Sequence, residues 1–362
     1  MRKYFRLNKM FSKDIVNTGR QIEVDLARGL AVLFMVLVHV QMYFSNEKLE
    51  QSVFGNFIDF FGGIPAAPVF MFLMGLGFLY SKNTDYRLFL KRGAYILFAG
   101  YILNFLRESL PAIIDYLNEG KKEDLTNAIE GFVDIDILQF AGLTMIFFGL
   151  FKWLRLKWWM ILNFVLIFSS LNYALQTVRT DAYVLSAITG LFWGSSEYSE
   201  FPFLTWIFYP ILGYVFAHIL MRCKNKKLFY RFLMITSIVA TLICFLLFKL
   251  VFRVDLGMES DLAYYHHNIF GNIVYGLFVI SWLSCLFLLV KYIPAIVLDQ
   301  FKRWSRNVTE IYFFHWILIG WLEWYFYPQT FGLIVFGMLM IMIFLASDGF
   351  SYFLNKKHIK LF

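Results

Sequence analysis

The sequence predicts an all-α, polytopic membrane protein with about ten transmembrane helices and both termini in the cytoplasm. Of its 362 residues, 60% are hydrophobic and 16% are charged, whereas a soluble chain is about half apolar and a quarter charged. The apolar residues form runs of about 20, the length that spans a hydrocarbon core. Lys and Arg gather in alternate loops between these runs, which is the positive-inside pattern of a chain that crosses the membrane repeatedly.

Ten apolar runs mark the predicted spans, and each is bounded by polar or basic residues. They cover residues 24–46, 57–81, 93–106, 137–152, 157–175, 203–221, 229–251, 268–291, 306–326 and 330–353. The second run contains Gly62-Gly63-Ile64-Pro65. This predicts a broken or kinked entry, which is tolerated where other helices or water satisfy the freed backbone groups. Residues 107–136 and 176–202 are predicted to be long loops, and residues 292–305 an interfacial helix.

Loop charge determines the predicted topology and domain organisation. The loops after spans 2, 4, 6 and 8 and the C-terminal tail are basic, and the loops after spans 1, 3, 5 and 7 are neutral or acidic. We therefore expect a basic cytoplasmic tail over 1–23, a single transmembrane domain over 24–353 and a second basic tail over 354–362. These loops account for the net charge of +8, so no nucleic-acid partner is expected.

Cysteine usage and the N-terminus narrow the class further. Cys223, Cys244 and Cys285 form neither a CxxC motif nor a Cys/His cluster, so neither a metal site nor a disulfide is expected. The N-terminus is polar up to Glu23 and has no A-x-A-like cleavage site. The first apolar run is therefore expected to be a retained span and not a cleaved signal peptide.

The first span carries the strongest functional signal, because Asp25, Arg28 and His39 lie in an apolar helix. Charged groups at bilayer depth are costly and usually face a protein interior or a wet cavity. Asp25 and Arg28 are expected near the inner face, and His39 roughly 22 Å above residue 24 at ~1.5 Å per residue. Imidazole can serve as a general base near neutral pH. The structural alternatives are an i,i+3 ion pair for the first two and a core histidine bonded to a backbone carbonyl.

Two further candidates lie at the start of the fourth span. Gln139 is expected at the depth of His39, where its amide would orient an acyl carbonyl or an acceptor hydroxyl; an interhelical hydrogen bond is the alternative. Asp136, like Asp134, lies just outside this span and would orient His39 or bind a sugar. A solvated loop acid is the alternative for both.

These residues belong to a recognisable pattern. The first span contains Arg20, then Asp25-x-x-Arg28-Gly29-Leu30-Ala31 and Met35-Val36-x-x-His39. Five later stretches follow in order at residues 65–75, 88–100, 137–143, 201–213 and 305–315. Together they resemble the bacterial relatives of heparan-alpha-glucosaminide N-acetyltransferase and, more widely, the membrane acyltransferase-3 proteins that acylate polysaccharides. The pattern of the animal lysosomal enzyme has Asn at the position of His39, so the role of His39 follows the bacterial-type pattern.

The resemblance implies a membrane acyltransferase of the bacterial cytoplasmic membrane. Acetyl-CoA or another short acyl-CoA would be the cytosolic co-substrate, and a hydroxyl or amine of an extracytoplasmic sugar or glycan would be the acceptor. His39 would remove the acceptor proton or carry the acyl group in a two-step route, and Gln139 or a backbone N–H would stabilise the oxyanion.

The resemblance also implies residues for the donor, because CoA is a polyanion and arginine binds phosphate in bidentate fashion. We expect its site at the inner mouth and along the ninth span, from Asp25, Arg28, Arg92, Arg306, Asn307, Glu310 and His315. The last three share a broad helical face, which would line a tunnel; a structural polar network is the alternative. Positive-inside topology alone is the alternative explanation for Arg92.

Two other function classes stay open at this point. A transporter or flippase for a small solute or lipid-linked sugar would also carry buried charges and a broken helix, but such folds commonly show inverted repeats, and the sequence has no visible repeat. A purely structural membrane subunit would not need a histidine, a glutamine and an Asp/Arg pair at bilayer depth. The bilayer itself is an expected partner, and the sequence leaves a homodimer open.

Overall fold

The computed structural model describes residues 10–81, 85–175, 178, 183–194, 199–326 and 329–357. Regular secondary structure in these residues is helical throughout, which confirms the predicted all-α class. Arg2, Lys3, Arg6 and Lys9 of the expected basic tail lie outside the described residues. The α-helices are α2 (Ile22–Phe44), α3 (Glu47–Glu50), α4 (Val53–Gly62), α5 (Ala67–Tyr80), α6 (Tyr86–Asn104), α7 (Leu110–Glu119), α8 (Lys122–Val133), α9 (Ile137–Trp153), α10 (Trp158–Leu175), α11 (Tyr183–Gly190), α12 (Phe203–Trp206), α13 (Phe208–Leu220), α14 (Lys226–Leu246), α15 (Asp261–Tyr265), α16 (Ile269–Leu289), α17 (Ala295–Arg306), α18 (Val308–Tyr325) and α19 (Leu333–Lys356).

Each of the ten predicted spans is helical within the described residues. Seven of these helical stretches are long and apolar enough to cross a membrane, namely Val53–Tyr80, Tyr86–Glu119, Trp158–Leu175, Phe203–Leu220, Lys226–Val251, Ile269–Tyr292 and Leu333–Lys356. The other three predicted spans are α2, α9 and α18, and these carry the candidate residues His39, Gln139 and His315. The chain is therefore a polytopic helical membrane protein, and the helices that hold the candidate residues are two that carry charged residues, α2 and α18, and one that is apolar but short, α9.

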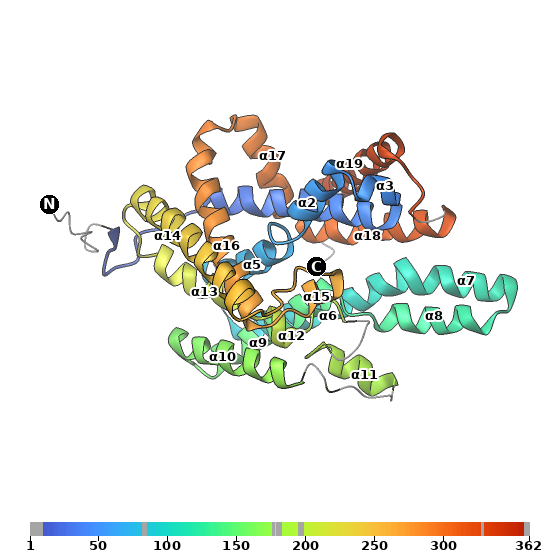
Figure 1. Cartoon of the computed structure of the whole chain (residues 1–362), viewed down its shortest axis with the longest axis horizontal. Coiled ribbons are helices and arrows are strands. Elements are labelled where there is room, and N and C mark those ends of the chain that lie inside the picture. Colours follow the sequence, from blue (N-terminus) through green and yellow to red (C-terminus); the bar gives the residue numbers. More distant parts are fainter. Residues whose placement is uncertain are drawn as a thin grey trace.

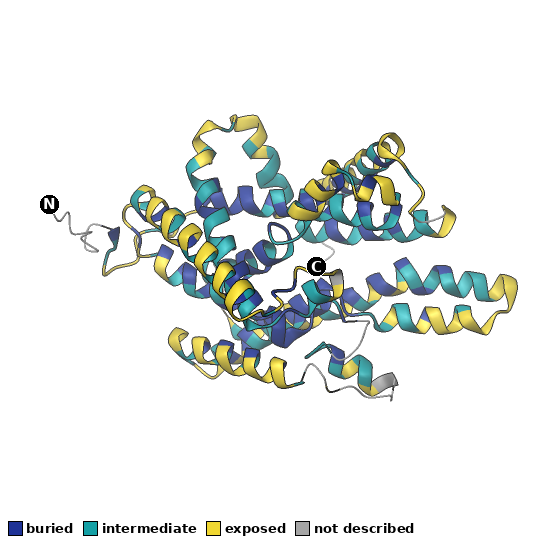
Figure 2. Cartoon of the chain, in the orientation of Figure 1, coloured by how far each residue is buried: buried dark blue, intermediate teal, exposed yellow. Residues whose placement is uncertain are grey.

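Figure 1 shows α2 lying along the long axis of the molecule, with its N-terminal end near the chain N-terminus and the α7–α8 hairpin projecting at the opposite end. Burial differs sharply between helices (Figure 2). In the span that contains α14, only 11% of the most apolar window is buried, and its exposed side chains include Ile235, Leu242 and Leu246. An outward face of this composition fits contact with lipid, because apolar side chains facing hydrocarbon lose nothing by exposure.

Glycines allow two helix pairs near the candidate site to pack closely. A Cβ at Gly75 of α5 would lie 1.9 Å from the backbone oxygen of Pro210 in α13, and one at Gly213 would lie 1.9 Å from that of Phe72. Residues with side chains cannot occupy such positions, and small residues are the usual means by which membrane helices approach one another. The α6–α9 pair meets in the same way through glycines 93 and 142.

The prediction of a polar loop over residues 107–136 is wrong. Helix α6 continues through a π-helical turn, Phe105–Ser109, into α7, and α8 returns to form the projecting hairpin. Pro111 lies directly after the π-helical turn and has no N–H to donate to it; the Leu106 carbonyl of that turn accepts from the Trp321 indole over 3.1 Å. The charges of this stretch suggested a loop, yet Leu103, Leu106, Leu110, Ile114 and Leu117 keep the spacing of a helix. The described part of the predicted loop 176–202 likewise contains a helix, α11.

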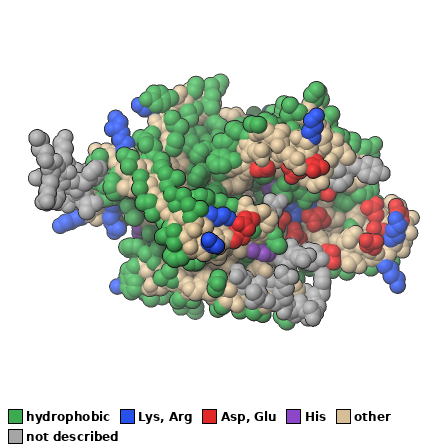
Figure 3. Space-filling view, in the orientation of Figure 1, with side chains coloured by type: hydrophobic (Ala, Val, Ile, Leu, Met, Phe, Trp, Pro, Cys, Tyr) green, Lys and Arg blue, Asp and Glu red, His purple; other side chains and the backbone are tan. Residues whose placement is uncertain are grey.

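Contacts at the two ends of α2 show how this helix is placed relative to α17 and α19. At the N-terminal end, Ser305 of α17 donates to Asp25 over 3.0 Å, and the neighbouring Arg303 pairs with Asp348 near the end of α19. At the other end, the Asn46 N–H donates to the Phe331 carbonyl, just before α19, over 2.9 Å. Through α17, the start of α2 is therefore connected to the C-terminal part of α19, and the end of α2 lies beside the start of α19. The acidic side chains visible in Figure 3 lie in the half that ends in the α7–α8 hairpin.

Candidate active site

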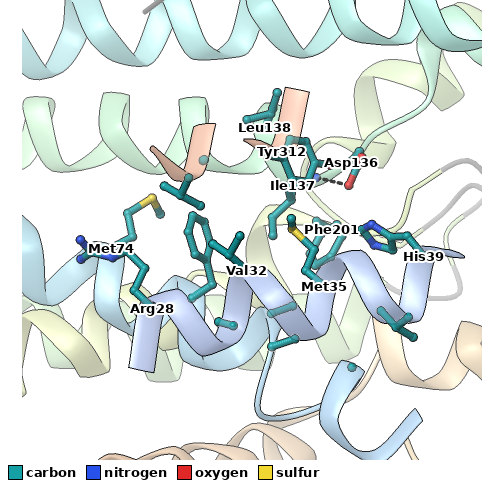
Figure 4. Close-up of a pocket in the computed structure, with 18 of the residues that line it drawn as sticks. Arg28, Val32, Met35, His39, Met74, Asp136, Ile137, Leu138, Phe201 and Tyr312 are labelled. Carbon is teal, nitrogen blue, oxygen red and sulfur yellow. Dashed lines mark hydrogen bonds between the residues drawn. The ribbon is translucent and has the colours of Figure 1, made fainter. Parts of the chain in front are cut away.

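A cavity of about 1110 Å³ follows one face of α2. Arg28, Val32, Met35 and His39 line it in that order (Figure 4), because spacings of three and four residues keep side chains on one side of a helix. Arg28 and His39 are separated by 11 residues, or about 16 Å along the helix. Most of the remaining lining comes from α4, α5, α6, α9 and α18 and from residues 257–265 before α16. One cavity therefore joins the inner arginines to the histidine.

Three arginines line the cavity where α2 begins. Arg28 is half-buried and donates from Nη2 to the Leu73 carbonyl over 3.1 Å. Arg92 and Arg306 are exposed, and Arg306 donates to its own helix through the Lys302 carbonyl. None of the ion pairs among the described residues includes these three guanidinium groups. The inner end is thus a cluster of cations without carboxylate partners, which suits a polyanionic ligand.

His39 is held by two neighbouring residues of α18. Its Nδ1 lies 2.9 Å from Nε2 of His315. Its ring stacks on Trp316 with the centroids 4.3 Å apart and the planes inclined by 27°. The ring of His39 also lines the cavity, whereas His315 is fully buried. The two contacts fix the orientation of the His39 imidazole.

A cluster of carboxylates around Arg107 lies on the side of the cavity opposite α2. Asp136 accepts a hydrogen bond from the Tyr312 hydroxyl and one of 3.2 Å from Arg107. The same guanidinium pairs with Asp134 at 3.1 Å and with Glu108 at 2.7 Å, and lies 4.3 Å from the ring centroid of Trp316. Figure 4 shows Asp136 and Tyr312 across from α2. Asp136 therefore lines the cavity, and its hydrogen bonds within the described residues go to Arg107, Tyr312 and the Ile137 backbone N–H rather than to His39.

Carboxylates outnumber cations in this cluster, and burial and this excess together raise the pKa values of Asp134 and Glu200, which lie between helices. Burial raises the pKa of Asp134 to about 7, with Glu108 and Asp136 adding to the rise and Arg107 opposing it. Burial also raises the pKa of Glu200 well above its ordinary value, and Asp134 and Asp136 contribute in the same direction. The folded protein consequently holds protons here that the unfolded chain releases.

Stability should therefore fall as the pH rises. The pKa of Asp134 is higher in the folded state than its ordinary value of 3.8, so the folded state binds the extra proton between pH 4 and 7. We expect a loss of roughly 2 kcal/mol in the free energy of unfolding between pH 5 and 8. Melting in detergent across this range checks it. Asp134→Asn should flatten the slope, whereas Glu123→Gln on the exposed first turn of α8 should not. An equal slope in both variants would contradict the assignment.

Gln139 is buried away from the cavity. Its amide nitrogen donates to the Asp134 carbonyl over 3.2 Å, its side chain packs against Gly100 of α6, and it is not among the residues that line the cavity. This hydrogen bond is local, to the segment between α8 and α9, so it is not the interhelical bond of the alternative, and it leaves Gln139 outside the cavity in which an oxyanion would form. Gln139 supports the backbone of Asp134 and, through it, the acid cluster.

Some of the residues predicted for the donor site line the cavity, and others are buried outside it. Asp25 does not pair with Arg28; it accepts from Arg20 over 2.5 Å and from Ser305 over 3.0 Å. Glu310 lines the cavity, whereas Asn307 and His315 are buried outside its lining. The expected tunnel face of the ninth span is therefore made by Glu310 with Thr309 and Tyr312.

Arg107, Tyr312 and Trp316 are the site residues that sequence reasoning missed. Arg107 was assigned to a loop, although the helical spacing of the leucines around it was a usable signal. Tyr312 and Trp316 lie four residues apart, so they share one face of α18. Aromatic residues are abundant in this chain, and nothing in their type distinguishes these two from lipid-facing ones.

Comparison with known proteins bears directly on this site. Residues 20–250 match the family model described as heparan-alpha-glucosaminide N-acetyltransferase, catalytic. The chain belongs to this family. No protein in the curated set matches it. The resemblance read from the motifs is confirmed, and the chain is a membrane acetyltransferase.

In this heparan-alpha-glucosaminide N-acetyltransferase family member, some site residues lie within the matched stretch and others lie beyond it. His39, Arg28, Asp136 and Arg107 all lie within the matched residues, which end beside the last turn of α14. Helices α16 to α19 lie beyond them. In this acetyltransferase, the partners of His39 on α18 are therefore supplied from outside the matched stretch.

Proposed function

We propose that this acetyltransferase moves an acetyl or other short acyl group from cytosolic acyl-CoA to a hydroxyl or amine of an extracytoplasmic sugar or glycan. The observation that carries the proposal is one cavity with three arginines at one end and His39 further along. The inner end binds an anion and the outer part holds a base. Acyl-CoA has phosphates at one end, which would bind the arginines, and a thioester at the other end, which would lie near His39.

The donor would bind with its phosphates at the inner mouth. Arg28, Arg92 and Arg306 are free of carboxylates among the described residues, so no existing ion pair must be broken. Valine and methionine side chains cover α2 between Arg28 and His39 (Figure 4). This apolar stretch suits an extended pantetheine arm, and the thioester would lie near the imidazole.

His39 would act as the general base. Its Nε2 accepts the proton of the acceptor O–H or N–H as the acceptor atom bonds to the thioester carbon. The carbon–sulfur bond then breaks, and the CoA thiolate takes the proton back from Nε2. Products are the acetylated acceptor and CoA thiol, so protons and electrons balance without a further reactant. In the described part of the chain, no group of three or more His, Cys, Asp or Glu side chains is placed to hold a metal ion.

The acceptor would enter from the opposite end of the cavity. There the lining includes Phe201, Tyr264 and Tyr265 together with Glu50 and Glu259. Aromatic faces suit sugar rings, and carboxylates accept hydrogen bonds from hydroxyl and amine groups. The basic loops predict that the arginine end faces the cytosol. The acceptor would then bind on the extracytoplasmic side, and the bacterial-type motifs favour a bacterial cytoplasmic membrane.

Purified protein with radiolabelled acetyl-CoA tests the proposal. With glucosamine as the acceptor probe, we expect label on the sugar, and without it only slow release to water. A protein that binds acetyl-CoA but moves no label to glucosamine, or to other amine- or hydroxyl-bearing sugars, would overturn the transfer reaction. A flippase would bind no acetyl-CoA.

Replacing Arg28 tests the donor site. We expect Arg28→Gln to raise KM for acetyl-CoA by about 10- to 100-fold, because a hydrogen bond to a charged group contributes roughly 1.5–3 kcal/mol. The salt dependence of KM should also weaken. Arg222→Gln is the matched control, because Arg222 is exposed near the end of α13 and does not line the cavity. Similar KM values for the two variants would contradict the assignment.

A further inference from the structure

The hydrogen bond between His39 and His315 has a defined geometry. Nδ1 of His39 lies 2.9 Å from Nε2 of His315, and the ring planes are inclined by only 10° with centroids 5.2 Å apart. Each nitrogen lies one ring radius from its centroid, so this separation is that of two rings meeting edge to edge along the bond. The contact is an in-plane N–H···N hydrogen bond rather than a face-to-face stack.

The far side of His315 decides which nitrogen carries the hydrogen. Nδ1 of His315 lies 3.2 Å from the Ile311 carbonyl. A carbonyl oxygen can only accept, so Nδ1 of His315 is the donor. A neutral imidazole has one N–H and one lone pair, which leaves Nε2 of His315 as an acceptor. Nδ1 of His39 must then donate to it.

We infer that His315 is a positioning residue that holds His39 in the tautomer with its hydrogen on Nδ1 and its lone pair on Nε2. The inference rests on the proposed function, in which Nε2 of His39 is the base. No described residue is hydrogen bonded to this nitrogen, and the ring lines the cavity. Stacking on Trp316 holds the same ring from its face. His315 therefore leaves the lone pair free for the proton of an acceptor.

The reverse assignment does not fit the structure. His315 is fully buried, does not line the cavity, and has both ring nitrogens engaged. It cannot reach an acceptor, so its effect must pass through His39. When His39 takes up a proton on Nε2, its Nδ1–H still donates to His315, and the bond then stabilises the imidazolium. The pairing thus serves both the resting state and the proton-bearing state.

Nitrogen NMR of protein labelled with 15N in its histidine rings tests the tautomer without an activity assay. We expect His39 to show hydrogen on Nδ1 and none on Nε2, with its signal assigned by comparison with His39→Gln. In His315→Leu the two tautomers of His39 should both be populated. A wild-type His39 with hydrogen on Nε2 would overturn the inference.

Kinetics with acetyl-CoA and glucosamine provide the second test. His315→Leu should lower kcat by about 100-fold and leave KM for acetyl-CoA unchanged, since loss of an orienting group can cost up to ~10⁴-fold in a serine protease. His315→Gln should restore most of the rate, because its Oε1 can take the place of Nε2 as acceptor. His315→Asn is too short to reach His39 and should stay slow. Wild-type kcat in His315→Leu and His315→Asn contradicts the positioning role.

Two controls separate this inference from the proposed function. His218→Gln on α13 removes a histidine that does not line the cavity and has no hydrogen bond to His39 or His315, and it should keep the wild-type rate. If His39→Ala is inactive and His315→Leu is normal, the positioning role fails and the acetyltransferase proposal stands. If His39→Ala is also normal, the proposed function itself fails.

Discussion

Replacing His39 with alanine is expected to abolish acetyl transfer while leaving acetyl-CoA binding intact. Removal of a general base costs about 10²–10⁴-fold in rate. Because stacking and a hydrogen bond fix the orientation of the His39 ring, we expect the rate loss to lie toward the upper end of this range. Arg28, the arginine of the donor site on the same helix, lies about 16 Å away along α2, so donor affinity should change little. Transfer of label to glucosamine measures the first quantity, and equilibrium binding of acetyl-CoA in detergent measures the second.

The matched control for this variant is His218→Ala, which removes another helix-borne histidine that does not line the cavity. It should transfer at the wild-type rate. Wild-type turnover in His39→Ala, with binding also unchanged, would sink the assignment of His39. Loss of both transfer and binding would instead indicate a folding defect, which thermal melting of the same sample reveals.

The same experiment also separates direct transfer from a two-step route. A rapid acid quench of the wild type should show no label on protein if the acceptor attacks the thioester directly. Label that appears on His39 before it reaches glucosamine would establish an acyl-histidine intermediate and move His39 from base to nucleophile. The tautomer with a free Nε2 serves either route, since the same lone pair would attack.

Apolar length predicted the helices of the ten runs, seven of which are long and apolar enough to cross a membrane, because a helix that faces lipid must be apolar over a fixed distance. The break in the second span was also predictable: α4 ends at Gly62 and α5 begins at Ala67, around the glycine and proline residues. The α7–α8 hairpin was not predicted, since its charges are typical of loops. Arg107 shows why: three carboxylates neutralise it, and they come from its own helix and from the segment that follows α8.

The candidate site was predictable only where one helix determines it. Arg28 and His39 share a face of α2 by periodicity, and the cavity follows that face. The His39–His315 bond joins residues 276 positions apart, and no local pattern predicts which polar groups of α2 and α18 will meet. The structural alternative for Asp25 and Arg28, an ion pair between them, fails for the same reason, because Arg20 and Ser305 approach Asp25 instead. That exchange leaves Arg28 available to a ligand.

Replacing Arg107 with methionine is expected to cause the largest loss of stability of any change considered. Its side chain is 3% exposed and pairs with three carboxylates. Breaking a buried ion pair by removing one partner typically costs about 3–5 kcal/mol, because the remaining charge is buried without compensation. We expect a correspondingly lower melting temperature in detergent, and a loss of activity, since Arg107 also contacts Trp316, on which His39 stacks.

Charge, rather than volume, should account for this loss. Protonation of Asp134 neutralises one of the stranded acids, so melting of Arg107→Met should recover at pH 5, and the double variant Arg107→Met with Asp134→Asn should be more stable than Arg107→Met alone. Arg303→Met is the matched control: its side chain is 30% exposed and pairs with one carboxylate, that of Asp348, so solvent reaches the pair and its loss should cost less than that of Arg107. Equal losses in Arg107→Met and Arg303→Met, or no recovery at low pH, would show that Arg107 does not neutralise the cluster. The acids would then need another counter-charge, and a cationic acceptor bound beside Asp136 would be the first to examine.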